Sequence, residues 1–379
     1  MTRAPLPLTG SFWPNDRQRL LLRAALGDSE DDGAWERLRA EVDVDDPDPV
    51  DYPLLALLYR QLEKLSVADP EVAKLRGIYR RTWYVNQLRR DRARDVVEAT
   101  SPLEALVFDG WELVLHYYRD LGLRDVSALH LLVPQQRLEQ AVRTLADLGW
   151  RRRAEARGRR PASFENQNAD LCFVHLRPFG EFSSLGRGID ADDVWERATV
   201  FDFAGVPARG FGDADELLHV CLSGARMHDR PSIVWIADAI AVLRGGSVDW
   251  DRLVGQARRL RATLRAADAL QFVREELAAP VPEGVVEELR RTPPRRRELL
   301  AHRAGAGRWS LVGAPPETLT RFLRLTSDAS VPHAVAELPA FLREDWGLER
   351  ARQVPAEAAR KAAARLRVSV RAERDRRAR

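Results

Sequence analysis

The sequence predicts an α+β protein in which a small mixed sheet lies between helical regions at both ends of the chain. Three patterns lead to this fold class. Residues 16–100 and 213–277 repeat apolar side chains three and four positions apart, which is the period of an amphipathic helix. Between them, residues 103–148 are typical of strand, Gly turn, helix, strand and helix in that order, and residues 199–211 of a strand or hairpin.

The N-terminal region, residues 1–100, contains four helical segments that Asp-Pro and Asp-Gly pairs separate. The last of these is long and basic and carries Tyr79, Trp83 and Tyr84 among seven arginines. Such a pattern occurs in nucleic-acid-binding proteins, but it is more typical of a helix with a solvated charged face and an aromatic core stripe. Nucleic acid is therefore not an expected partner.

The central stretch begins with an apolar run that ends at Phe108 and breaks at Asp109-Gly110. A helix is expected to follow to about Gly122, and a strand from Leu129 to Val133. A Gly turn that opens a helix presents free backbone N–H groups to a phosphate. Acidic residues alternating on the next strand would share one face and hold divalent metal against it.

The next segments complete the expected sheet. A hairpin is predicted from a strand at Arg151 to Ala156, a turn at Gly158 to Pro161 and a strand at Ala169 to Leu176. In the helices that follow, Asp238 is a carboxylate in an apolar segment and needs a buried partner, for which Arg226 and His228 are candidates. We divide the chain into residues 1–100, a core at 101–211, a helical region at 212–291 and a helical extension with a basic tail at 292–379.

The central stretch resembles the uncharacterised nucleotidyltransferase family of bacteria, within the polymerase-beta-type nucleotidyltransferase superfamily. Members carry a Lys-Gly turn, a Tyr-containing helix, an Arg and then Ser-Asp-Ile-Asp-Leu-Leu-Val. The corresponding residues here are Asp109-Gly110, Tyr117-Tyr118, Arg124 and Ser127 to Val133. The resemblance covers roughly residues 12–289 and implies a nucleotidyltransferase-type sheet.

The resemblance also implies a nucleoside triphosphate bound near Asp109, Gly110, Arg124 and Ser127, and two Mg²⁺ ions held by three carboxylates. Two of those carboxylates are replaced, because Ala128 and His130 stand at the acidic positions of the strand. Asp109 also replaces the lysine of the turn and would repel a triphosphate. Asp170 stands where the family has its third carboxylate, although the His-Trp that follows it there is Cys-Phe here.

Two hypotheses follow, and they leave open whether the protein is an enzyme. In the first, two-metal nucleotidyl transfer has been lost and the protein is a binding or accessory protein in peptide natural-product tailoring, with a peptide substrate or a partner biosynthetic enzyme. In the second, it is an active nucleotidyl- or glycosyl-type transferase with a remodelled site. His130 and Asp170 would then act as acid and base or as ligands of a softer metal.

Each of these residues also has a structural explanation. A histidine on an apolar strand is commonly a hydrogen-bonded core residue, so His130 need not bind anything. Asp170 has many arginines nearby in the sequence, and Arg124 can pair with Asp120 or Asp125 instead of a phosphate.

Composition sets the remaining expectations. An apolar fraction of 45% in 379 residues supports an ordinary buried core, and the net charge is +3. Cys172 and Cys221 lack partners at zinc-site spacing, which favours buried free thiols. The N-terminus has no signal-peptide pattern and no segment is long and apolar enough to span a membrane, so we expect a cytoplasmic protein.

Overall fold

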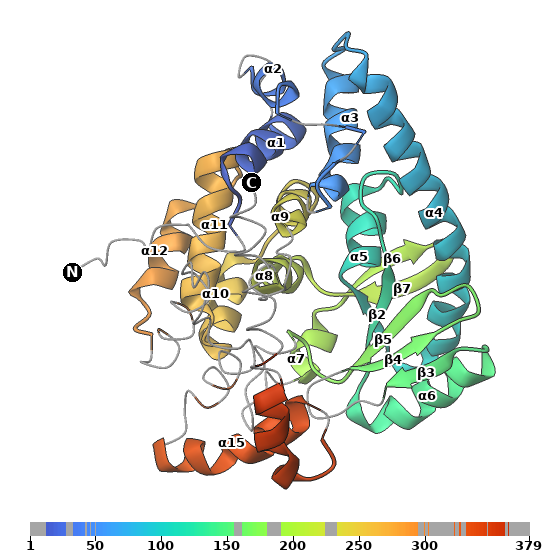
Figure 1. Ribbon diagram of the computed structural model, residues 1–379, viewed down its shortest axis with the longest axis vertical. Coiled ribbons are helices and arrows are strands. Elements are labelled where there is room, and N and C mark those ends of the chain that lie inside the picture. The colour runs from blue at the N-terminus through green and yellow to red at the C-terminus, as the bar shows by residue number, and fades with distance from the viewer. Residues whose placement is uncertain are drawn as a thin grey trace.

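The computed structural model describes residues 13–27, 33–41, 44–45, 47–49, 51–154, 161–179, 191–223, 233–294, 299, 302, 322, 326, 331–346, 348–360 and 363. One seven-stranded mixed sheet lies between helices from both ends of the chain, so the predicted α+β class is confirmed (Figure 1). No helix in this described part is long and apolar enough to cross a membrane.

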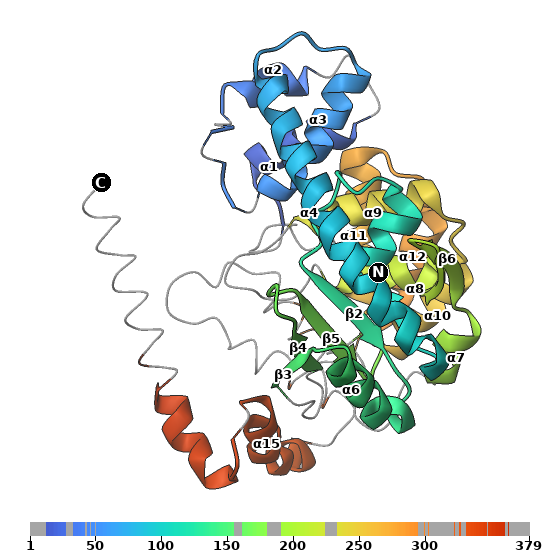
Figure 2. The same cartoon turned by 90° about the vertical axis from the view of Figure 1, so that its right-hand side faces the viewer.

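The N-terminal helices form where the apolar period places them. Their bounds are α1 Asp16–Leu26, α2 Ala34–Arg39, η2 Tyr52–Leu54, α3 Leu55–Lys64 and α4 Glu71–Thr100. Asn15 caps α1 through a capping box with Gln18, which satisfies backbone N–H groups at the start of the helix. Figure 2 shows α4 running from the N-terminal helices down to the sheet.

The aromatic residues of α4 do not all point inward. Tyr79 packs against Tyr59, with ring centroids 5.3 Å apart, as expected for a core stripe. Trp83 is 43% exposed and Tyr84 is 60% exposed, so the expectation of a buried aromatic stripe is wrong for these two.

The strands are ordered β3-β4-β5-β2-β1-β7-β6. The pairs β2–β5 and β1–β7 are parallel, and the other neighbours are antiparallel. Ala128 lies opposite Leu171, and His130 lies opposite Phe173. The strand bounds are β1 Leu106–Phe108, β2 Ala128–Leu132, β3 Arg151–Ala154, β4 Ala162–Glu165, β5 Leu171–His175, β6 Thr199–Phe203 and β7 Val206–Gly210.

The predicted hairpin between residues 151 and 176 is corrected by an additional strand. β4 pairs with both β3 and β5, so β3 and β5 are not neighbours. The four residues of β4 alternate between buried and half-buried positions, but this run is too short to stand out in the sequence. The predicted turn at 158–161 falls mostly outside the described residues, whereas the predicted hairpin at 199–211 is confirmed by β6 and β7.

The helix after the Gly turn also differs from the prediction. Only Gly110–Glu112 is α-helical (α5), and Leu113–Tyr118 forms a π-helix, η4, which ends at Arg119 with φ 54°. The apolar pattern does not distinguish the two because their periods are close. The side chains of Tyr117 and Tyr118 extend from this π-helix toward the C-terminal helices, where their hydroxyls bond Asp213 and Asp238.

The two faces of the sheet are covered by different helices (Figure 1). One apolar cluster joins α4 and the helix Leu138–Asp147 (α6) to Val107, Leu129 and Cys172. The other joins Phe108 and Leu132 to the helices at both ends of the chain. Both cysteines are buried free thiols, as predicted. The remaining helices are η3 Ser101–Leu103, η5 Gln135–Arg137, α6 Leu138–Asp147, α7 Ala191–Glu196, α8 Asp213–Ser223, α9 Val234–Gly245, α10 Trp250–Arg259, α11 Thr263–Leu277, α12 Glu283–Arg291, α15 Val331–Asp345 and η7 Ala351–Gln353.

Candidate functional site

The Gly turn lies at the end of β1, where the chain leaves the sheet. Asp109 has φ 63° and ψ −141°, an unusual conformation for a residue with a side chain. A Cβ at Gly110 would lie 3.0 Å from a methyl group of Val126, which favours glycine at this position. The helix that follows has only three α-helical residues, so the turn does not open the regular helix that a phosphate site of this kind uses.

Arg124 occupies the space beside this turn. Its guanidinium donates to both carboxylate oxygens of Asp238, at 3.2 and 3.1 Å, and lies 3.6 Å from the carboxylate of Asp109. Tyr118 donates its hydroxyl proton to the same Asp238 at 3.0 Å. Asp238 is thus partnered by Arg124, and the two candidates named from the sequence, Arg226 and His228, lie outside the described residues.

The electrostatics of this group are unfavourable for a triphosphate. Burial raises the pKa of Asp238 and the charge of Asp109 adds to the rise, although Arg124 opposes it. Burial alone would lower the pKa of Arg124, but Asp238 and Asp109 outweigh it and raise that pKa. With both carboxylates ionised, two negative charges share one guanidinium, and an added anion meets no surplus positive charge.

Two further buried carboxyl groups lie close to this turn and were not singled out from the sequence. Glu112 of α5 and Glu216 of α8 are both 0% exposed, and no oxygen of either makes a well-formed hydrogen bond to a described residue. Burial raises the pKa of Glu112 well above its usual value, and the charge of Glu216 adds to the rise. Burial raises the pKa of Glu216 as well, with added contributions from Asp109 and Asp238.

His130 faces an aromatic group on the side of the sheet that packs against the C-terminal helices. Its Nδ1 lies 3.1 Å from Nε2 of His175, and its ring stacks on Phe173 with centroids 5.2 Å apart. The ring of Phe108 is in edge contact with His130, His175 and His219. Among the described residues no group of three metal-ligating side chains occurs. The sequence could have indicated His175, because residues two positions apart on a strand face the same side and His175 is two positions after Phe173.

Asp170 lies on the opposite face of the sheet from His130. It precedes β5, and alternation along the strand places it on the side of Cys172, toward α4. Arg92 donates to its two carboxylate oxygens at 2.5 and 3.0 Å, and Asn166 donates at 2.9 Å. Burial alone would raise the pKa of Asp170, but these hydrogen bonds and the charges of Arg92 and Arg89 lower it.

The structure therefore does not bring His130 and Asp170 into one site. Of the four expected nucleotide-binding residues, it brings together Asp109, Gly110 and Arg124. Ser127 instead shares a shallow pocket of about 10 Å³ with Asp170, which is hardly enough space for one water molecule.

The implied magnesium pair does not fit the residues present. Two Mg²⁺ ions need carboxylates that converge from one face. On the face that carries His130, β2 presents Ala128 and β5 presents Leu171, Phe173 and His175. None of these side chains is a carboxylate, and Asp170 faces the other way.

Comparison with known proteins assigns the chain to a family. A family model described as an uncharacterised nucleotidyltransferase matches residues 52–278. The chain belongs to this family. A solution structure of the antibiotic-resistance factor ANT(2″)-Ia is similar at 13% identity, over 50% of this chain and 95% of that chain, with a TM-score of 0.33. No curated protein matches the chain.

The nucleotidyltransferase family match locates the unusual features within the shared part of the chain. It begins at Tyr52, the start of η2, and ends just past α11, so α1 and α2 lie outside it. This is shorter than the range of roughly 12–289 expected from the resemblance. Asp109, His130 and the Arg124–Asp238 pair all lie inside it.

Proposed function

We propose that this member of the nucleotidyltransferase family does not carry out two-metal nucleotidyl transfer and acts as a binding protein. The observation that carries the proposal is the face of β2 and β5, where Ala128, His130 and Phe173 leave no oxygen ligand for magnesium. A hard divalent cation finds no oxygen ligand there. Without the cation, the negative charge of a triphosphate lacks its main counter-charge.

The Gly turn supports the same proposal. A phosphate-binding turn needs free donors and positive charge, whereas here Arg124 is held by Asp238 and Asp109. A triphosphate would have to displace two carboxylates from one guanidinium. The cost of breaking a buried pair of this kind is about 3–5 kcal/mol, more than a single phosphate contact returns.

For the partner, we extend the proposal to a peptide, or an enzyme that modifies one, in natural-product tailoring. This extension comes from the family resemblance. It predicts that the protein forms a complex whose stability does not depend on added nucleotide or metal.

A second candidate is an active transferase that uses acid–base chemistry without the metal pair. The observation that favours it is the 3.1 Å contact between His130 and His175, since paired imidazoles are suited to proton transfer near neutral pH. Asp170 would have no part in it.

Calorimetric titration tests the two candidates directly. ATP, GTP, UTP and CTP are each titrated into the protein with and without Mg²⁺ and Mn²⁺. The proposal predicts no metal-dependent heat with any nucleotide. Metal-dependent binding of any nucleotide would overturn the proposal, and metal-independent binding that His130→Gln abolishes and Asp170→Asn leaves unchanged would favour the second candidate.

A further inference from the structure

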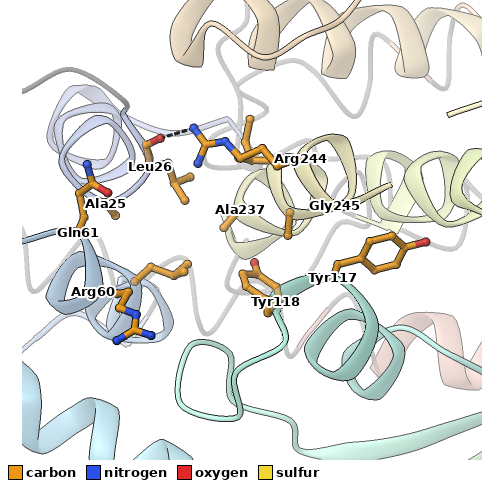
Figure 3. Close-up of a pocket in the computed structure, with 12 residues that line it drawn as sticks. Ala25, Leu26, Arg60, Gln61, Tyr117, Tyr118, Ala237, Arg244 and Gly245 are labelled. Atoms are coloured by element: carbon orange, nitrogen blue, oxygen red, sulfur yellow. Dashed lines mark hydrogen bonds between the residues drawn. The ribbon is translucent and has the colours of Figure 1, made fainter. Parts of the chain in front are cut away.

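A pocket of about 270 Å³ opens between the N-terminal helices and the sheet-flanking helices. Figure 3 shows its walls, which come from α1, α3, η4 and α9. It is distinct from the Gly turn, although Tyr118 contributes to both. A liquid water molecule occupies about 30 Å³, so the space suits a ligand of about nine or ten non-hydrogen atoms.

Part of the pocket wall is apolar and includes three alanines. Ala25 of α1, Leu57 of α3, and Ala237 and Ala241 of α9 line it. These alanines create the space, because a larger side chain at either position of α9 would extend into it. Apolar walls of this kind gain free energy when an apolar ligand displaces water.

The charged residues of the pocket are of one sign. Arg60 of α3 and Arg244 of α9 line it, and none of the described lining residues is a carboxylate. Glu63 and Asp120 pair with Arg60 at 3.0 and 3.5 Å, so the charge of Arg60 is already balanced by carboxylates outside the pocket.

Contacts with the end of α1 hold Arg244 and the helix α3 in place. Arg244 donates to the backbone carbonyl of Leu26 at 2.8 Å, which fixes its guanidinium over α1 (Figure 3). Next to Arg60, Gln61 donates to the carbonyl of Gly27 at 2.7 Å. The guanidinium of Arg244 is thus in place before any ligand arrives, which reduces the entropy lost on binding.

We propose that this pocket binds a small amphipathic anion, with an apolar chain among the alanines and a carboxylate toward Arg244. The proposal is independent of whether nucleotidyl transfer has been lost. A ligand there would contact Tyr118, whose hydroxyl bonds Asp238 and through it Arg124 beside the Gly turn. The side chains of Tyr118, Asp238 and Arg124 therefore form a chain of hydrogen bonds from the pocket to the Gly turn.

The test uses three probes that share one chain and differ in head group: octanoate, octylammonium and 1-octanol. Each is titrated calorimetrically into the full-length protein at low ionic strength. We expect octanoate to bind at least about tenfold more tightly than octylammonium, with octanol between them, because one charge-assisted contact is worth about a factor of ten. Equal affinity for octanoate and octylammonium would overturn the proposal.

Two variants locate the site. Ala241→Trp fills the pocket and should abolish octanoate binding. Arg244→Gln keeps the fold and should weaken octanoate by about tenfold while leaving octanol unchanged. Arg80→Gln on the exposed face of α4 is the matched control and should change neither affinity. Octanoate binding that survives both pocket variants, or that falls equally with Arg80→Gln, would contradict the site.

Discussion

The two faces of the central strands differ in how they hold charge. On the face toward α4, Asp170 pairs with Arg92 near solvent, and its pKa is lowered. On the side of the C-terminal helices, Asp238 meets Arg124 in the interior, and its pKa is raised despite the partner. The comparison shows that the pKa of an ion-paired carboxylate depends on its burial as well as on its partner. Desolvation outweighs the attraction to the arginine for Asp238, whereas the attraction outweighs desolvation for Asp170.

The largest expected difference between the two pairs is in stability. Arg124→Ala leaves Asp238, 4% exposed, without its cation and should lower the free energy of unfolding by about 3–5 kcal/mol. Arg92→Ala should cost about 1–2 kcal/mol, because Asp170 keeps Asn166 and some contact with water. Urea denaturation of both variants and the wild type measures this. Equal losses would show that the two faces are alike in polarity.

The next difference is in pH dependence. The raised pKa of Glu112 means that the folded state favours the neutral acid. Its contribution to stability is complete below its unfolded pKa of about 4.3 and is lost as pH rises through the folded pKa. Glu112→Gln should therefore gain about 1–3 kcal/mol relative to the wild type between pH 5 and pH 8.

The pKa of Asp170 is shifted in the opposite direction from that of Glu112. Its lowered pKa contributes stability above the unfolded value of about 3.9, which is lost as pH falls through the folded pKa. Asp170→Asn should thus be less stable than the wild type by the same amount at pH 5 and pH 8. A difference that changes between these pH values for Asp170→Asn, or stays constant for Glu112→Gln, would reverse the assignment.

The smallest expected difference concerns the thiols, one in each apolar cluster. Burial raises the pKa of Cys172, and burial raises the pKa of Cys221 to about 12. Neither should react with iodoacetamide at pH 8 in the native protein, and both should react in urea. Mass spectrometry after graded urea treatment reports each site. Earlier labelling of Cys172 would show that the α4 face opens separately.

Much of the fold follows from local patterns in the sequence. The periodic segments of the N-terminal region became α1–α4, and the alternation around Ala204-Gly205 became the β6–β7 hairpin. β4 was missed because four residues after a basic stretch carry little pattern. The π-helix was missed because an apolar repeat does not report whether hydrogen bonds span four residues or five.

The candidate site was less predictable, for a different physical reason. Residue types identified Asp109, His130 and Arg124 as unusual, but the face on which each lies depends on register. Asp170 and His130 appear compatible in sequence, yet the pairing of His130 with Phe173 turns Asp170 away. The need for a partner at Asp238 was evident, whereas its identity, 114 positions away, required the tertiary structure.

The 30-residue helix α4 has a mechanical consequence. At about 1.5 Å per residue it is a rod of about 45 Å. One half packs on α3, which forms a wall of the pocket, and the other half packs along β7 and α6 beside Asp170 (Figures 1 and 2). An unbroken rod transmits a tilt along its whole length. A shift of α3 therefore changes the packing of α4 on β7 and α6 unless the helix bends.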